Sequence, residues 1–235
     1  MREPLLAWFR EHGRDLPWRE TRAPYRILVS EVMLQQTQVA RVVPRYERWL
    51  ARWPTVEALA AAPAADVIRE WDGLGYNRRA IALHRTAQVV AARGWPEDLT
   101  ELPGVGRYTA DAIRCFAFGE AVLPADTNVL RVRERTGFAF DHECAQALFD
   151  LGREVCLARV PRCEVCPLAA DCPSRGRRFE PRRKQGPFEG SFRQRRALAL
   201  KLVARGEQPA DDEAVASLAR DGLVAVVEGS VRLPE

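Results

Sequence analysis

The stretch LPGVGRYT at residues 102–109 constrains this chain more than any other, because it places a Gly-x-Gly turn between two helical segments. An acidic segment, 96–101, leads into it, and residues 108–118 follow with apolar side chains on one helical stripe. We expect Gly104 and Gly106 to adopt backbone conformations that a Cβ would forbid. A helix–hairpin–helix of this kind presents backbone amides at the start of its second helix, which suits a phosphate. Taken alone, the pattern is more typical of a plain structural turn.

Most of the remaining chain has the pattern of α-helices. No segment before residue 222 alternates apolar and polar residues over a sustained stretch, as a half-buried strand would. Pro24 suits the first turn of a helix, and Pro54 and Pro63 break the pattern between helices. The body is therefore predicted to be all-α, with helices at about 1–12, 24–37, 39–53, 55–61, 64–72, 77–92, 108–118 and 127–135.

The C-terminal residues 193–235 have a different pattern. Two helices, 193–205 and 211–220, precede a β-hairpin formed by 223–227 and 230–233. This order predicts a small winged-helix-like unit, which either binds DNA or caps the main domain.

Positive charge is concentrated in one segment, although the whole chain carries only +4. Residues 173–196 contain nine arginines and lysines against two glutamates, a local charge of +7. A segment this basic either contacts a polyanion or is a solvated linker. No apolar run reaches the length of a membrane span, and the N-terminus has no signal-peptide pattern. We therefore expect a cytoplasmic protein of one or two domains that makes no membrane contact.

Four cysteines form one compact motif, C-x6-C-x2-C-x5-C, at Cys156, Cys163, Cys166 and Cys172. In a chain expected to be intracellular, such thiols indicate a metal site rather than disulfides. Zinc usually takes two close pairs, whereas one loop of four thiolates also suits a [4Fe–4S] cluster. Spacing alone leaves both metals open, and we expect the site to be structural.

Two carboxylates are candidates for chemistry. Glu31 lies among apolar residues of the predicted helix 24–37, although a single glutamate there can also face solvent. Asp126 directly precedes the helix 127–135, so it is a candidate N-cap as well. Apolar surroundings would favour the protonated form of Glu31, and the helix N-terminus would favour the ionised form of Asp126.

Together these segments resemble the helix–hairpin–helix DNA glycosylases of the endonuclease III superfamily, and within it the adenine-DNA glycosylase (MutY) family. The resemblance covers residues 1 to about 173 in collinear order. It implies a two-lobed all-α fold and a [4Fe–4S] cluster on the four cysteines. The motifs that carry it are LPWR at 16–19, SEVMLQQTQV at 30–39, GLGY at 73–76, LPGVGRYT at 102–109, DTNV at 126–129 and the cysteine loop.

The resemblance also implies a role for each matching residue. Glu31 would protonate the adenine at N7, and Asp126 would stabilise the oxocarbenium-like sugar, with Tyr108 and Asn128 as supports. This division follows from the chemistry, since cleavage through a cation-like sugar needs one protonated and one ionised carboxyl. Gln36 and Tyr76 match residues that enter the duplex near the opposite base. The further residues expected to contact DNA are Gln35, Leu102, Gly104, Val105, Gly106 and Arg107.

Lysine is absent from residues 1–172, and Tyr108 stands where bifunctional relatives carry a catalytic lysine. We therefore expect a monofunctional, monomeric, nucleoid-associated glycosylase that leaves an intact abasic site in double-stranded DNA with a mismatched or damaged pair. The predicted organisation is a glycosylase core at 1–172 with its cluster loop at 156–172, a basic linker at 173–192 and the winged-helix-like segment at 193–235.

Two other functions stay open. A thymine or uracil mismatch glycosylase of the same superfamily shares the glutamate, tyrosine and aspartate, but the run Gln35-Gln36-Thr37 favours adenine. A non-catalytic DNA-binding module is disfavoured because Glu31 and Asp126 both occur in matching contexts. The chain departs from the family in its short interval between Asp126 and Cys156, where a helix looks trimmed or merged. We also expect no MutT-like C-terminal domain, so recognition of 8-oxoguanine is the part that the resemblance supports least.

Overall fold

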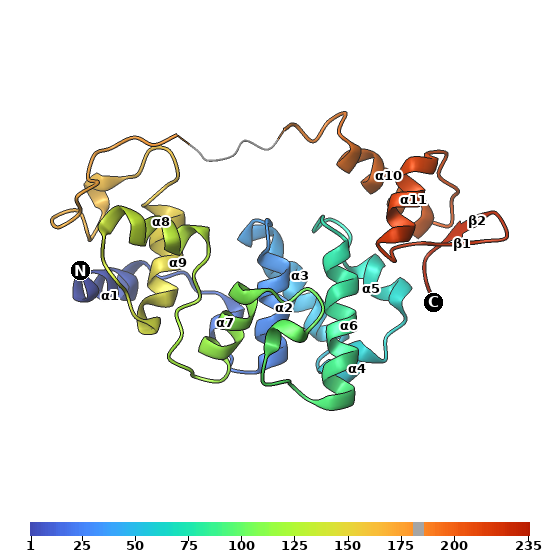
Figure 1. Ribbon diagram of the computed structural model, residues 1–235, viewed down its shortest axis with the longest axis horizontal. Coiled ribbons are helices and arrows are strands. Elements are labelled where there is room, and N and C mark those ends of the chain that lie inside the picture. Colours follow the sequence, from blue (N-terminus) through green and yellow to red (C-terminus); the bar gives the residue numbers. More distant parts are fainter. Residues whose placement is uncertain (181–185) are drawn as a thin grey trace. The chain divides into compact units, whose positions relative to one another are not determined.

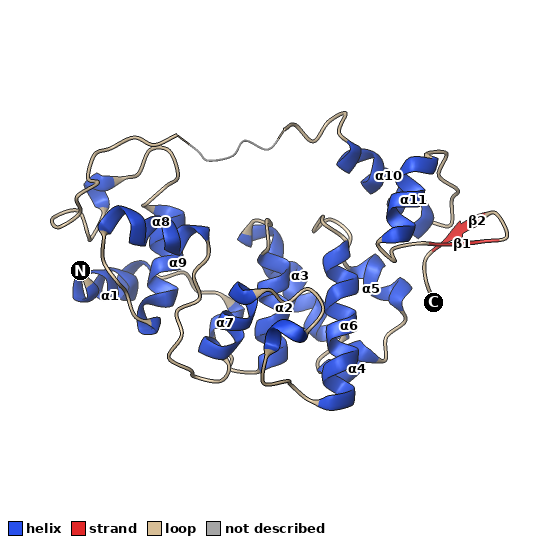
Figure 2. Ribbon diagram, viewed as in Figure 1, coloured by secondary structure: helices blue, strands red, loops and turns tan. Residues whose placement is uncertain are grey.

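The computed structural model describes residues 1–180 and 186–235, and the regular secondary structure of these residues is almost entirely helical (Figures 1 and 2). The chain forms two compact units, each made of two separate stretches: a first unit of Met1–Ile27 with Gly106–Lys184, and a second unit of Leu28–Val105 with Gln185–Glu235. Part of the predicted basic linker, residues 181–185, lies outside the described residues. No helix in the described ranges is long and apolar enough to cross a membrane.

The first unit is built around a buried cluster from three helices and the cysteine loop. Leu5 of the N-terminal helix, Val132 and Leu148 contribute to this cluster, and Leu168 joins it from between the third and fourth cysteines of the loop. The loop is thus anchored to the helices by an apolar side chain, as well as carrying its thiols. The elements of this unit are α1 (Arg2–His12), η1 (Pro17–Arg19), α7 (Arg107–Phe116), α8 (Thr127–Thr136), η3 (His142–Cys144), α9 (Ala145–Glu154) and η4 (Cys163–Val165).

The second unit contains most of the apolar helix α2 (Pro24–Leu34), which begins in the first unit. Leu28 on α2 is fully buried, as are Trp49 and Trp71, whose rings meet edge to face at 5.6 Å between centroids. Such aromatic pairs stabilise a core beyond the area that they bury. The other elements before the hairpin are α3 (Val39–Arg52), α4 (Val56–Ala60), α5 (Ala64–Glu70), α6 (Arg78–Arg93) and η2 (Leu99–Glu101).

The C-terminal segment has the predicted order of two helices and a hairpin. Ser191 and Asp211 cap α10 (Phe192–Ala204) and α11 (Asp212–Arg220), each accepting a hydrogen bond from a backbone N–H of the first turn. Strands β1 (Ala225–Val227) and β2 (Ser230–Arg232) then pair antiparallel, with Val226 opposite Val231. They form the only sheet in the described part of the chain (Figure 2), so the prediction of an all-α body with a small α+β tail is confirmed.

Three local predictions differ from the structure. The helix predicted to continue to residue 37 ends at Leu34, because Gln36 has a left-handed backbone with φ of 55°. The first helix of the hairpin is a single 3₁₀ turn, η2, capped by Asp98. Helix α9 was not predicted; together with α8 it occupies most of the interval between Asp126 and Cys156, where we expected a helix to be trimmed or merged.

Candidate active site

The residues predicted to form the site fall in both units. The second unit holds Glu31, Gln35, Gln36, Tyr76, Leu102, Gly104 and Val105. The first unit holds Gly106, Arg107, Tyr108, Asp126, Asn128 and the four cysteines of the loop.

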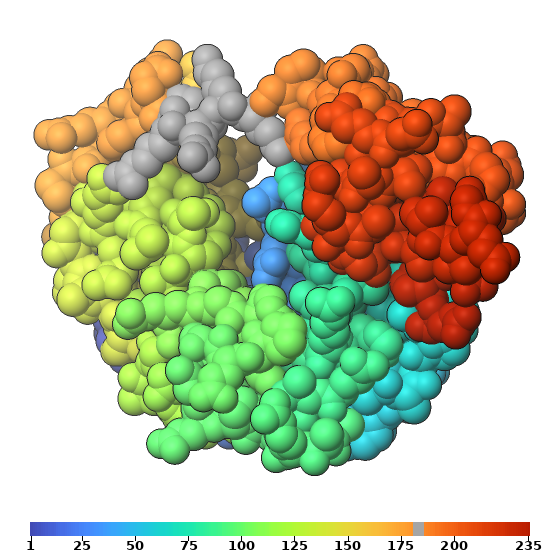
Figure 3. All heavy atoms as spheres, turned by 45° about the vertical axis from the view of Figure 1, so that its right-hand side comes forward, coloured from blue at the N-terminus to red at the C-terminus, as the bar shows by residue number. Residues whose placement is uncertain are grey.

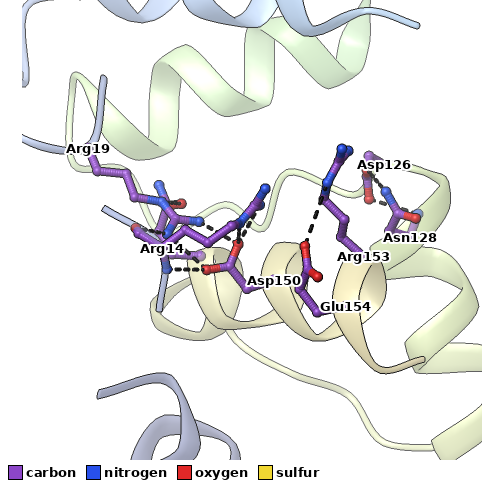
Figure 4. Close-up of polar contacts among 8 residues, drawn as sticks. Arg14, Arg19, Asp126, Asn128, Asp150, Arg153 and Glu154 are labelled. Atoms are coloured by element: carbon purple, nitrogen blue, oxygen red, sulfur yellow. Dashed lines mark hydrogen bonds and ion pairs between the residues drawn. The ribbon is translucent and has the colours of Figure 1, made fainter. Parts of the chain in front are cut away.

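Asp126 is fixed by three hydrogen bonds at the start of α8 (Figure 4). Its Oδ1 accepts from the backbone N–H groups of Asn128 and Val129, both at 2.8 Å, which is the geometry of an N-cap. Its Oδ2 accepts from Asn128 Nδ2 at 2.7 Å. The capping role and the candidate chemical role therefore coexist, because the cap holds the carboxylate in one orientation.

A chain of hydrogen bonds links Asp126 to the cysteine loop through Arg131, which sequence reasoning missed. The Arg131 Nη2 group donates to Asn128 Oδ1 at 2.7 Å and to the Gly152 carbonyl at 2.6 Å. Its Nε donates to the carbonyl of Cys156 at 2.9 Å. Burial lowers the pKa of the Arg131 guanidinium, which nevertheless stays charged at neutral pH. The only sequence signal for this contact is the i, i+3 spacing of Asn128 and Arg131 on α8.

Helix α9 supports both Tyr108 and Asn128. The ring of Phe149 packs against that of Tyr108, with 6.4 Å between centroids and 64° between planes. Gly152 lies so close to α8 that a Cβ on it would come within 2.7 Å of the Asn128 Cβ. A side chain at position 152 would therefore push Asn128 away from Asp126, so glycine is required here by packing.

Asp150, on the same helix, is fully buried between two arginines of the N-terminal segment (Figure 4). It accepts hydrogen bonds from the backbone N–H and Nε of Arg14 at 3.0 and 2.8 Å and from both terminal nitrogens of Arg19 at 2.9 Å. Burial by itself would raise the pKa of Asp150, but the hydrogen bonds from Arg19 and Arg14 hold it below its usual value. Arg19 was predicted only as part of a motif, and the structure shows which group it binds.

Glu31 is buried, with 6% of its surface exposed, on the apolar helix α2. Its neighbours along the helix, from Val29 to Met33, are all buried as well. The solvent-facing alternative is therefore wrong. A carboxyl removed from water in this way is disfavoured in its charged form.

Arg79 on α6 holds the end of α2 against the GLGY turn, and sequence reasoning missed it. Its guanidinium donates to the carbonyls of Val32 and Met33 at 2.7 and 3.0 Å, and to those of Leu74 and Gly75 at 3.1 and 2.9 Å. Burial lowers the pKa of Arg79 to about 10, so it remains a cation at neutral pH. It satisfies carbonyls that the end of a helix leaves without an intrahelical partner.

Gln36 and Tyr76 share an unusual backbone. Their φ angles are 55° and 47°, in the left-handed region that non-glycine residues rarely adopt. Both side chains are exposed, and both line one groove of the second unit. Such conformations cost roughly 1–3 kcal/mol each and concentrate at functional sites. Among the described non-glycine residues only Glu228, in the turn between β1 and β2, shares a positive φ with these two.

The hairpin is held at its tip by Gly104 but not by Gly106. Gly104 has φ of +75°, and a Cβ on it would come within 2.6 Å of Ala82 Cβ, so it must be glycine. Thr86 fixes the turn by donating to the Pro103 carbonyl at 2.8 Å. Gly106 has φ of −87° and space around it, so the prediction of a conformation closed to other residues is wrong for this position. It is the N-cap of α7 and has no side chain to cover the amides of the first turn.

The four cysteines line a single pocket in the first unit, together with buried apolar residues of α8 and α9. Arg135 Nη1 lies 3.4 Å from Cys156 Sγ, and the Gly176 N–H donates to Cys163 Sγ at 3.3 Å. Burial, with the other three thiols nearby, raises the pKa of Cys166 to about 11. In the described ranges no three cysteine, histidine or acidic side chains gather closely enough to hold a single metal ion.

Residues 29–154 match the family model described as "HhH-GPD superfamily base excision DNA repair protein". The chain belongs to this superfamily. It is also 40% identical to an adenine DNA glycosylase of Mycobacterium tuberculosis, over 98% of this chain and 92% of that protein. The resemblance to the adenine-DNA glycosylase family is thereby confirmed.

Solved structures of the HhH-GPD superfamily confirm the fold. A thermostable thymine-DNA glycosylase has a TM-score of 0.66 at 27% identity, covering 73% of this chain and 93% of the other. A trapped endonuclease III–DNA covalent intermediate has a TM-score of 0.62 at 25% identity, covering 73% and 92%. The family match includes Glu31, the hairpin and Asp126, and it ends at residue 154, before the first cysteine of the loop.

The strained backbone of Gln36 allows a test that separates stability from DNA binding in this superfamily member. We expect Gln36→Gly to raise the free energy of unfolding by about 0.5–1 kcal/mol, because glycine adopts a positive φ without strain. If Gln36 contacts the duplex as the resemblance implies, the same change should also weaken binding to a mismatched duplex. Urea unfolding and fluorescence anisotropy measure the two effects.

Gln88→Gly on α6 is the matched control for this substitution, since Gln88 is exposed and helical. It should lower stability by about 1 kcal/mol and leave DNA affinity unchanged. A loss of stability for Gln36→Gly as large as that for Gln88→Gly would show that the left-handed backbone carries no strain.

Proposed function

We propose that this chain is a monofunctional DNA glycosylase of base excision repair that excises adenine opposite 8-oxoguanine or guanine. One contrast carries the proposal: the family match includes a carboxyl buried on an apolar helix, Glu31, and a carboxylate held by three N–H donors, Asp126. Glycosidic cleavage needs this pair of environments, one for an acid and one for an anion. Forty per cent identity to an adenine DNA glycosylase supports adenine as the base.

In the proposed mechanism Glu31 gives a proton to N7 of the flipped adenine, and the bond between N9 and the sugar C1′ then breaks with its electrons leaving on the base. Asp126 stabilises the positive charge on the sugar until water adds at C1′, and the proton that the water loses returns Glu31 to its acid form. Asn128 holds one oxygen of Asp126 and is itself held by Arg131. Tyr108, positioned by Phe149, supports the site from α7.

The duplex is gripped at two places. The amides of Gly104, Val105, Gly106 and Arg107 are proposed to bind a backbone phosphate at the N-terminus of α7. Gln35, Gln36 and Tyr76 are proposed to contact bases around the opposite position. We further propose that the protein acts as a monomer on the nucleoid of a bacterial-type cytoplasm.

The four cysteines are proposed to hold a [4Fe–4S] cluster. The donor set fits, because four thiols line one pocket of apolar residues and N–H groups already approach two of the sulfurs. When bound, the cluster would supply a structural cross-link of the loop to the helices. Arg131 donates one hydrogen bond to the Cys156 carbonyl at the start of this loop and another to Asn128 Oδ1. A movement of the loop would therefore also move Asn128.

Base release without strand cleavage is expected because residues 1–172 contain no lysine to form a Schiff base. The test is a panel of duplexes with adenine opposite 8-oxoguanine, adenine opposite guanine, thymine opposite guanine and uracil opposite guanine. We expect release only from the first two, with an abasic site that stays intact until alkali is added. Efficient borohydride trapping of a protein–DNA adduct would contradict the monofunctional assignment.

A second candidate is a thymine or uracil mismatch glycosylase, which is favoured by the structural similarity to a thymine-DNA glycosylase. The same panel separates the two functions, because release of pyrimidines alone would replace adenine as the substrate.

A further inference from the structure

The C-terminal segment packs onto helices α5 and α6 within the second unit. Ile68 of α5 and Ile81 of α6 share one buried cluster with Leu200, Leu218 and Leu223. In Figure 3 the C-terminal residues, orange to red, lie directly on this part of the surface. The segment therefore has a defined place beside α6 and helps to shape the surface there.

A groove of about 1410 Å³ lies beside this contact, with α6 along one side and α10 along the other. We call it the basic groove, because its lining includes ten arginines and lysines and only two aspartates. Pockets for small molecules usually measure about 300–1,000 Å³. The basic groove is larger, so a stretch of polymer suits it better than a single small anion.

Much of the positive charge of the basic groove is available to a ligand. Arg41, Arg85, Lys201 and Arg205 are exposed and, within the described part of the chain, have no carboxylate within ion-pair distance. By contrast, Arg78 and Arg196 of the same groove share Asp221. The excess charge thus comes from both sides, from α3 and α6 and from the last turn of α10.

Exposed aromatic rings accompany these charges. Phe188 and Phe192 line the basic groove with 52% and 37% of their surfaces exposed. Cationic side chains interleaved with exposed rings are typical of surfaces that bind nucleic-acid strands, whose phosphates and bases use both. An acidic peptide would form ion pairs with the arginines and lysines, but it offers no bases to stack on the two phenylalanine rings.

We infer that the basic groove binds the DNA strand carrying the base opposite the excised adenine, which assigns the C-terminal segment to DNA binding rather than to a capping role. This inference rests on the proposed function, in which Gln36 and Tyr76 enter the duplex near that base. Both residues line the basic groove. A strand that passes them therefore continues between α6 and α10, where Lys201 and Arg205 meet its phosphates.

Arg205→Glu tests the inference against Arg93→Glu as a matched control. Both arginines are exposed at the C-terminal end of a helix of the second unit, but only Arg205 lines the basic groove. With a duplex carrying adenine opposite guanine, we expect Arg205→Glu to raise Kd about 5–10-fold at 0.1 M salt and to lower the slope of log K against log salt by roughly 0.9. Arg93→Glu should leave both values within about twofold of the wild type.

Neutral methylphosphonate linkages identify the strand. Placed in the strand opposite the adenine, they should remove the difference between wild type and Arg205→Glu, whereas in the adenine strand they should preserve it. If methylphosphonates in the adenine strand removed the difference between wild type and Arg205→Glu instead, the strand assignment would be overturned. Equal Kd values for Arg205→Glu and Arg93→Glu would overturn the inference itself. Lys201→Gln provides a second variant with a smaller change, should Arg205→Glu lower the melting temperature.

Base release is measured separately from binding, so the two proposals can fail independently. A wild-type protein that binds duplex but releases no adenine contradicts the proposed function. The comparison of Arg205→Glu with Arg93→Glu would still show whether the basic groove binds DNA. A wild-type protein that releases adenine with unchanged affinity in Arg205→Glu contradicts only the groove.

Discussion

Replacing Glu31 by glutamine is expected to lower the single-turnover rate of adenine release by roughly 10²–10⁴-fold, the usual contribution of a general acid. Glutamine keeps the size of the side chain and can still form hydrogen bonds, but its amide protons are not acidic enough to be transferred to N7. Because Glu31 is buried on α2 and is not among the residues proposed to grip the duplex, the affinity for duplex should change little. Rapid-quench assays with enzyme in excess measure the rate, and anisotropy measures the affinity.

Glu47→Gln is the control for this substitution. Glu47 lies on α3 in the same unit, and its side chain is exposed. We expect wild-type excision from it, so that any loss in Glu31→Gln is assigned to position 31 and not to the removal of a negative charge. Full excision by Glu31→Gln with intact DNA binding would mean that another group supplies the proton.

The parts of the site that depend on local sequence could be predicted. Asp126 was predicted as an N-cap because an aspartate directly precedes a helical pattern, and the cap is present with both backbone donors. Gly104 was predicted from a turn between helices, and its positive φ bears this out. In each case a backbone rule involving neighbours in the chain was sufficient.

The connections between distant residues could not be predicted in this way. Arg79 binds carbonyls more than 40 residues earlier in the chain, and Arg131 binds the carbonyl of Cys156 on a different element. Nothing in the residues around either arginine distinguishes it from the many exposed arginines of this chain, because only the tertiary packing removes it from water. The left-handed backbone of Gln36 was not predicted for a related reason: its helix-favouring neighbours predicted that α2 continues, whereas α2 ends at Leu34, where Arg79 joins its last turn to the GLGY turn.

Helix α9 shows how three such connections combine in four residues. Phe149 contacts Tyr108, Asp150 binds the N-terminal segment, and Gly152 packs against Asn128. The four-residue motif FDLG therefore joins α1 and its following loop to both supports of the candidate active site. A substitution of Asp150 should consequently lower the free energy of unfolding, and it should affect the position of Asn128 only indirectly, through α9.

Asp150→Asn is expected to lower the free energy of unfolding by about 3 kcal/mol at pH 7, the lower end of the 3–5 kcal/mol for breaking a buried ion pair. The lower end applies because the side chains of Arg14 and Arg19 keep 25% and 13% of their surfaces exposed, so water partly solvates them when the carboxylate is gone. Urea unfolding measures the change. Glu154→Gln on the same helix is the control, since it breaks only an exposed pair with Arg153 and should cost less than 1 kcal/mol.

Acid should remove the same stabilisation from the wild type. Because the pKa of Asp150 is lower in the folded protein than in the unfolded chain, its contribution is complete above the ordinary carboxyl pKa of about 4 and is lost as the pH falls through the folded value. The unfolding free energies of wild type and Asp150→Asn should therefore differ most at neutral pH and converge below pH 4. A difference that stays constant down to pH 2 would show that the asparagine acts by disturbing the packing of α9, and that the ion pair with Arg14 and Arg19 adds no stability.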